Sequence, residues 1–181
     1  AHDKLNNSDS VIEVAKKFLT NYSADENIAE VLSLLAKAYD KNGLSSDADY
    51  FYDRLFSEHY DSVYAKWGLL YMAESLEASG SSSKAKDLYL RALKETQDLE
   101  VGVVAGFKLA QNYMSSSNYK ESAQYIQKVA KVKPEFFVQQ KDESIDLMFS
   151  FVENEDYKSG SIIAKALLQN IKKNEDEYEE L

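Results

Sequence analysis

The 181-residue chain contains no cysteine, two histidines, one proline and six glycines. Without cysteine it has no disulfide, no thiolate zinc site and no cysteine nucleophile. The two histidines, His2 and His59, offer too little material for a catalytic or metal-binding histidine cluster. Glycine and proline are the usual turn residues of strand-rich folds, and both are scarce here, so the composition indicates a helical protein.

Long apolar runs and basic residues are also scarce. The longest apolar runs, such as residues 68–73, span a handful of positions, whereas a transmembrane helix needs about 20. We therefore expect no membrane span. The chain has 31 acidic and 21 basic residues, a formal net charge of -10, which disfavours a phosphate backbone as partner. We expect its partners to be other proteins or protein segments, and not nucleic acid.

The common catalytic signatures are missing as well. No G-x-x-x-x-G-K-[ST], G-x-G-x-x-G or G-x-S-x-G string occurs, so the usual phosphate-binding loops and the serine-hydrolase elbow are absent. Neighbouring acids such as Asp47 and Asp49 lie at expected helix starts and turns, where solvation explains them. The sequence therefore predicts no enzyme activity, no catalytic residue, no cofactor and no metal site.

What the chain does contain is a recurring helical phrase. Ala36, Ala73, Ala110 and Met148 occupy corresponding positions, at intervals of 37, 37 and 38 residues. Each follows a large apolar residue and precedes a turn and a second helical pattern. A period in this range indicates stacked helical hairpins. Small residues allow two helices to approach closely, and large ones fill the space one turn away.

The periodicity predicts nine helices. Their ranges are 9–22, 25–42, 46–58, 61–79, 83–98, 100–116, 119–132, 135–153 and 157–174. Four pairs of a short polar residue and an acid three positions later are typical of helix starts: Ser10 and Glu13, Ser23 and Glu26, Ser46 and Asp49, Asn118 and Glu121.

The phrase at residues 109–134, with Leu109, Ala110, Tyr113, Tyr119 and Pro134, resembles the tetratricopeptide repeat (TPR). This resemblance implies an all-α right-handed superhelix (solenoid) of about four TPR-like hairpins plus an extra N-terminal helix. The chain departs from the family pattern at Ser122 and Gly160, where alanine is expected, and its period exceeds the family's 34 residues. Related helical-hairpin repeats remain an alternative.

Two longer phrases resemble a bacterial cell-envelope subclass of these repeats. They are KKFLTNYSADENIAEVLSLLAKAY and DRLFSEHYDSVYAKWGLLYMAE. The subclass includes periplasmic coordinators, outer-membrane assembly factors and flagellar-motor scaffolds. The resemblance implies a periplasmic scaffold, although a cytoplasmic location also fits the sequence.

The layout suggests that the chain is a fragment of a longer protein. We expect residues 1–8 to be a flexible start or tag remnant, 9–174 to be the repeat array, and 175–181 to be an acidic frayed end. The first helix reads as the second half of a hairpin, so contact with further repeats of the same chain is expected.

The candidate binding residues lie on the first helix of each hairpin, which in this family lines the concave groove. The resemblance implies a partner-binding groove formed by Lys37, Trp67, Tyr71, Glu74, Phe107, Lys108 and Gln111. Aromatic side chains are favoured anchors of interfaces, although an aromatic stripe at helical spacing also fits a buried core. The family's clamp for a peptide carboxylate is disfavoured, because Glu74 would repel it.

Two functions follow from this reading. The first is a non-catalytic scaffold for protein interactions that helps to assemble or position parts of a bacterial envelope machine such as a flagellar motor. The alternative is an adaptor that captures an extended or helical peptide in its concave groove.

Overall fold

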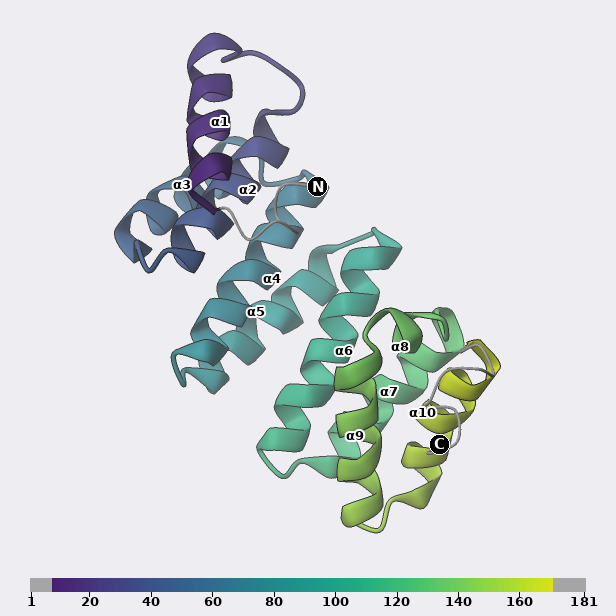
Figure 1. Cartoon of the computed structure of the whole chain (residues 1–181). Coiled ribbons are helices and arrows are strands. Elements are labelled where there is room, and N and C mark those ends of the chain that lie inside the picture. Colours follow the sequence, from purple (N-terminus) through teal and green to yellow (C-terminus); the bar gives the residue numbers. More distant parts are fainter. Residues whose placement is uncertain (1–7, 171–181) are drawn as a thin grey trace. The chain divides into compact units, whose positions relative to one another are not determined.

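The computed structural model describes residues 8–170, which form ten helices and no strand (Figure 1). The prediction of an all-α fold is confirmed. The predicted flexible start, apart from Ser8, and the acidic end lie outside the described residues. The chain divides into two compact units, Ala1–Val101 and Gly102–Leu181.

Most helix bounds agree with the predicted ranges to within three residues. The first unit contains α1 (Ser8–Asn21), α2 (Ile28–Lys41), α3 (Ser45–Glu58), α4 (Val63–Ala78) and α5 (Ser82–Glu95). The unit boundary falls early in α6 (Leu99–Ser115), and the second unit continues with α7 (Tyr119–Val132), α8 (Phe136–Gln139), α9 (Lys141–Glu153) and α10 (Tyr157–Asn170).

The first unit consists of two hairpins and a covering helix. Helix α2 pairs with α3, α4 pairs with α5, α2 also packs on α4, and α1 packs on α2. The small residues predicted at the close crossings, Ala36 and Ala73, are fully buried, as are Ala48 and Ala85 on the second helices. At Gly68 a Cβ would lie 2.9 Å from Leu55 Cδ2, so α3 and α4 approach at a position where only glycine fits without a shift.

The second unit is held by a cluster of phenylalanines and by two substitutions in the repeat pattern. Ser122, which replaces the expected alanine, is buried, and its hydroxyl donates to the Ala110 carbonyl oxygen at 2.7 Å. This bond ties α6 to α7. At Gly160 a Cβ would lie 3.1 Å from Val152 Cγ2, so glycine permits the close approach of α10 to α9.

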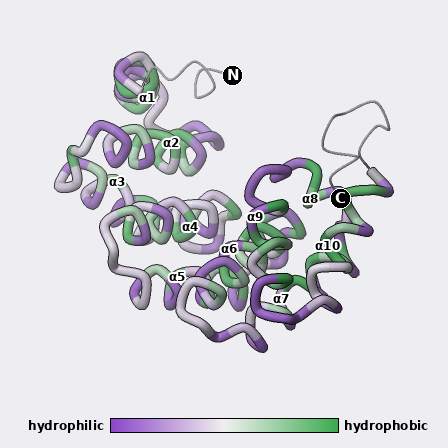
Figure 2. The backbone as a smooth tube through the Cα atoms, turned by 60° about the horizontal axis from the view of Figure 1, so that its bottom comes forward, coloured by the Kyte–Doolittle hydropathy of each residue, from purple (hydrophilic) through white to green (hydrophobic). Residues whose placement is uncertain are grey.

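Hydrophobic and hydrophilic residues alternate along the helices of both units (Figure 2). In the second unit the apolar side chains meet in one core, which includes Val103, Phe107, Ile126, Phe136, Phe137, Phe151 and Leu167. In the first unit they form two smaller clusters, one around Ala36 and Tyr52 and one around Leu32 and Leu55. Each hairpin thus covers an apolar face of its neighbour within the unit.

The predicted single helix over 135–153 is wrong. The chain breaks at Gln140, which has φ -116° and ψ 54°, and separates α8 from α9. Both Phe136 and Phe137 are buried. The backbone of Gln140 leaves the helical region, so α8 need not share the axis of α9 and can place both rings in the core of the second unit.

The helix-start predictions are also wrong in detail. Helix α1 begins at Ser8 and α3 at Ser45, so Ser10 and Ser46 lie inside helices. Helix α2 begins at Ile28, after a turn in which Asp25 Oδ1 accepts from the Asn27 amide. Asn118 does precede α7, but its side chain makes no cap hydrogen bond.

Side-chain caps occur instead at three other helix starts. The Ser62 hydroxyl accepts a hydrogen bond from the Ala65 amide. In the same way the Asp98 carboxylate accepts from the Val101 amide, and the Asp156 carboxylate accepts from the Ser159 amide.

A buried lysine fixes the loop between the two hairpins of the first unit. Lys66 is 6% exposed, and its Nζ donates to the Tyr60 carbonyl oxygen at 2.8 Å and to Glu95 Oε2 at 3.4 Å. The same ammonium lies 4.0 Å from the Tyr60 ring centroid. Arg91 Nε also donates to Glu95, at 3.1 Å. A buried charge is tolerated because each of these groups is paired.

This network predicts a pH-dependent contribution of Glu95 to stability. Burial alone would raise the pKa of Glu95, but hydrogen bonds from Tyr60, Arg91 and Lys66 outweigh it and lower the pKa below its usual value. A carboxyl with a lowered folded-state pKa stabilises above its unfolded pKa of about 4.3 and loses this contribution as the pH falls through the folded value.

We therefore expect Glu95→Gln to lower the free energy of unfolding by about 1 kcal/mol at pH 7. The difference from the wild type should shrink towards zero as the pH falls from 5 to 3, because protonated Glu95 no longer pairs with Lys66. Urea unfolding of both proteins across this range measures it. A difference that stays constant with pH would contradict the role assigned to the charge.

Candidate functional site

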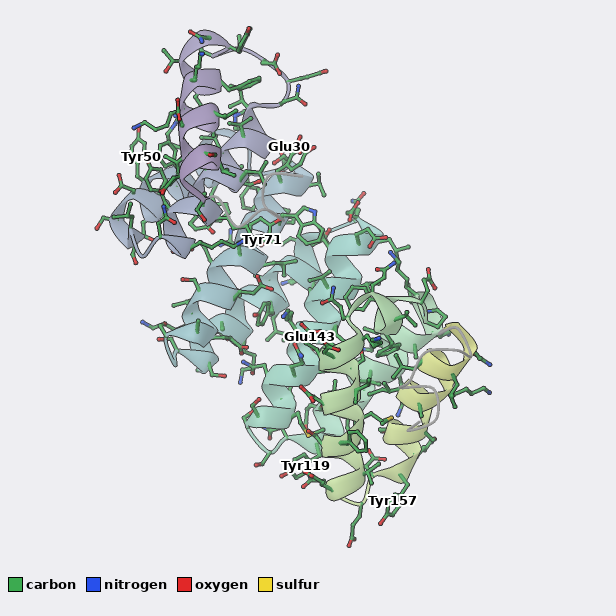
Figure 3. The ribbon with its side chains drawn as sticks, viewed as in Figure 1. Glu30, Tyr50, Tyr71, Tyr119, Glu143 and Tyr157 are labelled. Carbon is green, nitrogen blue, oxygen red and sulfur yellow. The ribbon has the colours of Figure 1, made fainter. Side chains whose placement is uncertain are left out.

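Four of the predicted groove residues lie together in the first unit. Lys37 comes from α2, and Trp67, Tyr71 and Glu74 come from α4, the first helices of neighbouring hairpins. Trp67 and Tyr71 are one helical turn apart, and their rings stack with centroids 6.0 Å apart and planes at 25°. We call these four residues the aromatic surface; Tyr71 is labelled in Figure 3.

The aromatic surface is neither core nor fully exposed. Trp67, Tyr71 and Lys37 are half-buried, and Glu74 is exposed. Lys37 Nζ lies 4.1 Å from the centroid of the Tyr71 ring, within cation–π range. This contact orients the ring and keeps a positive charge beside the aromatic pair. The surface therefore offers apolar area together with both signs of charge.

A pocket of about 210 Å³ opens beside the Tyr71 ring. We call it the α2/α4 pocket. Its lining residues carry two carboxylates, two ammonium groups and two hydroxyls, and most of the lining surface is apolar. The lining residues are Lys37, Asp40, Lys41, Tyr71, Glu74, Ser75 and Ala78. The volume is too small for a helix and suits one side chain or a small part of an extended segment.

Two groups near this pocket are energetically unusual. The hydroxyl of Tyr52, on α3, is buried next to the Asp40 carboxylate. Burial, and then the neighbouring Asp40 carboxylate, raise the pKa of Tyr52. Tyr71 and Glu74 act on this pKa in the same direction.

The carboxyl of Asp40 is the second unusual group. Burial raises the pKa of Asp40, the hydroxyls of Tyr52 and Ser75 lower it in part, and the Asp49 carboxylate raises it. Asp40 is thus a half-buried carboxylate that the hydroxyls of Tyr52 and Ser75 compensate in part.

The remaining predicted groove residues lie in the second unit, and one of them is inaccessible. Phe107 is 1% exposed, and its ring meets those of Phe136 and Phe137 edge to face, with centroids 5.4 and 6.1 Å away. Phe107 lies four residues after Val103 and three before Ala110, on the stripe of α6 that enters the core. Its ring cannot extend an exposed aromatic strip.

Lys108 and Gln111 are half-buried on another face of α6. Gln111 borders a pocket of about 190 Å³ between α6 and α9. That pocket is lined by both apolar and acidic side chains. Its lining residues are Gln111, Met114, Ser115, Glu143, Asp146, Leu147 and Ser150; Glu143 is labelled in Figure 3.

A third pocket, of about 490 Å³, lies beside the Lys66 network. Its walls come from the α3–α4 loop and the segment after α5, residues 60–63, 66 and 95–98. Three of its four charged residues already have partners: Lys66 and Glu95 bind each other, and Asp98 accepts from the Val101 amide. The fourth is Asp61.

Three pieces of the candidate site could not be recognised in the sequence. Asp40, Tyr52 and Ser75 belong to three different helices, and only the fold brings them together. The available signal was the 37-residue recurrence of Tyr52 at Tyr89, which is likewise buried. The repeat pattern predicts that both rings pack inside the hairpins, but it does not predict the surroundings of their hydroxyls.

The described residues contain neither a metal-binding cluster nor a membrane-spanning helix. No group of three or more histidine, aspartate or glutamate side chains among them is arranged to hold a metal ion. Between residues 8 and 170 no helix combines the length and apolar character that crossing a membrane requires.

The fold resembles a solved structure. The crystal structure of MamA aligns with a TM-score of 0.62 over 91% of this chain and 90% of that chain, at 21% sequence identity. No protein-family model and no curated protein sequence matches the chain. The likeness to MamA, a TPR-like helical protein, confirms the predicted TPR-like helical repeat fold.

Proposed function

We propose that this chain is a non-catalytic scaffold for protein–protein interactions and that it uses the aromatic surface of the first unit to hold a partner. The observation that carries the proposal is the stacked, half-buried pair of Trp67 and Tyr71 beside Lys37. Large rigid aromatic side chains bury much area at a low cost in conformational entropy, which makes them frequent anchors of interfaces.

The fold supports the same proposal. Stacked helical hairpins leave the first helices of successive repeats side by side, as α2 and α4 are in the first unit. Such a face can contact an extended or helical segment along several turns. The adaptor function, in which one peptide segment is captured, is a special case that the α2/α4 pocket favours, because its volume suits a single side chain.

The charge of the chain indicates the kind of partner. Residues 8–101 contain 17 acidic and 10 basic residues, whereas residues 102–170 contain eight of each. The acid excess of the described residues thus belongs to the first unit, which carries the aromatic surface. A basic or neutral protein segment complements it, and a nucleic acid does not.

The sole tryptophan of the chain provides a direct test of the aromatic surface. We expect Trp67→Ala to remove partner binding while it changes the free energy of unfolding by less than about 1 kcal/mol, since the side chain is only half-buried. The measurement is capture of partners by the tagged full-length protein, with thermal unfolding of each variant. Tyr50→Ala is the matched control, because Tyr50 is an aromatic residue on α3 that is 58% exposed.

The proposal fails if Trp67→Ala recovers the same partners as the wild type. A loss of stability as large as that of a core truncation, about 3 kcal/mol or more, would assign Trp67 to packing instead.

We further propose that the scaffold works in a bacterial cell envelope, on the periplasmic side, in an assembly such as a flagellar motor. The support is the resemblance of residues 16–39 and 53–74 to the envelope subclass of these repeats. A reporter fused to the C-terminus of the full-length gene product tests the location. We expect alkaline phosphatase, which needs an oxidising compartment, to be active in this fusion. Activity of a cytoplasmic reporter alone would contradict the periplasmic proposal.

A further inference from the structure

The first helix of each hairpin ends in the same turn, so one backbone geometry recurs along the chain. Helices α2, α4, α6 and α9 are each followed by a residue with positive φ and by the backbone hydrogen bonds of a Schellman motif. The positive-φ residues are Gly43, Gly80, Ser117 and Glu155, with φ of 72°, 79°, 59° and 62°. The residues before them are Asn42, Ser79, Ser116 and Asn154. These turns share a backbone and differ in their side chains.

Only the turn after α2 places an asparagine before a glycine. Asn42-Gly43 is the one Asn-Gly pair in the sequence. In such a pair the backbone nitrogen of the second residue can attack the side-chain amide of the first, because glycine has no Cβ to obstruct the approach. In the turn after α9, Glu155 follows Asn154 and adds a side chain beside the same nitrogen. Asn154 is therefore an obstructed asparagine on an equivalent backbone.

The Asn42 amide also attaches α1 to α2 (Figure 1). Its Nδ2 donates to Asp9 Oδ1 at 2.8 Å and so joins the end of α2 to the start of α1. The amide of Asn154 differs, because it donates at 2.8 Å to the Ser150 carbonyl oxygen of its own helix. Helix α1 fully buries only Ala15, so one hydrogen bond is a larger share of its attachment than it would be for a core helix.

We propose that Asn42 is a site of spontaneous deamidation and that its conversion to aspartate or isoaspartate loosens α1 from α2. The Gly43 nitrogen attacks the Asn42 Cγ, and the new N–Cγ bond closes a succinimide ring. The Cγ–Nδ2 bond breaks, and the amide proton of Gly43 leaves with the ammonia. Water then opens the ring and leaves a carboxylate at residue 42. The reaction needs no oxidant, metal or enzyme.

Two native contacts limit the rate of this reaction. The Gly43 amide donates to the Asp40 carbonyl oxygen at 2.9 Å, and the Asn42 amide is held by Asp9. Both bonds must open before the nitrogen and Cγ can meet. Asn42 and Asp9 are exposed at helix ends, where local opening requires the least free energy. The reaction therefore proceeds from the folded protein, at a rate that the attachment of α1 sets.

Deamidation removes the contact that slowed it. A carboxylate at residue 42 cannot donate to Asp9, and the two like charges repel each other across the former hydrogen bond. Helix α1 contributes Ile12, Ala15 and Leu19 to the cluster around Ala36 and Tyr52, so its loosening uncovers part of that cluster. The hydrolysis is not reversed spontaneously, so the change proceeds in one direction as the protein ages.

Mass spectrometry of the full chain, incubated at mildly alkaline pH, tests the site. Trypsin cleaves after Lys41 and Arg54 and releases residues 42–54, in which aspartate and isoaspartate separate from asparagine by chromatography. We expect residue 42 to convert while Asn154 stays intact in the same sample. Asp9→Ala should speed the conversion about fivefold, because it frees the amide. Glu13→Ala, at another exposed acid of α1, should leave the rate unchanged.

Amide hydrogen exchange tests the release of α1. Asn42→Asp reproduces one product of the reaction. We expect the amides of α1 to exchange about tenfold faster in this variant than in the wild type, because a repulsion replaces a hydrogen bond. Asn154→Asp is the matched control, since it removes an amide that bonds within its own helix. It should leave the exchange of α1 unchanged. Thermal unfolding confirms that both variants are folded.

Each part of the proposal can be overturned separately. Equal conversion of Asn42 and Asn154, or conversion of neither, would overturn the assignment of the site. Unchanged exchange of α1 in Asn42→Asp would overturn the release of α1 even where residue 42 converts. Neither result bears on the aromatic surface, which is tested by the partners that Trp67→Ala recovers.

Discussion

The close approach of paired helices at small residues is the constraint on which the rest of each unit depends. Ala36, Ala73 and Ala110 are fully buried, and any larger side chain at these positions would push the helices of a hairpin apart. Where the repeat pattern departs from alanine, the replacement keeps the approach. Ser122 adds a buried hydrogen bond to the Ala110 carbonyl, and Gly160 removes the side chain altogether. Each hairpin still has an apolar face to cover, and its neighbour within the unit provides the cover.

In this arrangement the first helices of neighbouring hairpins keep a partly exposed face. In the first unit the face carries the Trp67 and Tyr71 stack and the Lys37 contact. The Lys66 network provides the contrast. Lys66 is more deeply buried than Lys37, and its ammonium is paired with Glu95 and the Tyr60 carbonyl. The same unit thus contains one buried charge that serves stability and one half-buried charge that serves recognition in our proposal.

The sequence predicted the class of fold and the register of its repeats because both depend on recurring residue size. The alternation of alanine with large residues at a 37-residue interval is visible without coordinates. Accessibility was harder to predict. Helix α6 carries apolar residues on several faces, so sequence spacing could not tell that the Phe107 ring enters the core. Local periodicity carries no information about tertiary packing. It therefore could not predict the break at Gln140 or the meeting of Asp40, Tyr52 and Ser75.

The central claim is that stability is shared between neighbouring hairpins, so that covered helices are stable and the uncovered faces remain for partners. Native-state amide hydrogen exchange of the full chain tests it most directly. Helix α1 buries only Ala15, whereas α2 packs against α1, α3 and α4. The account predicts graded protection, with α1 exchanging through local opening and α2 and α4 among the most protected helices of the first unit. Equal protection of all described helices, lost in a single global opening, would contradict it.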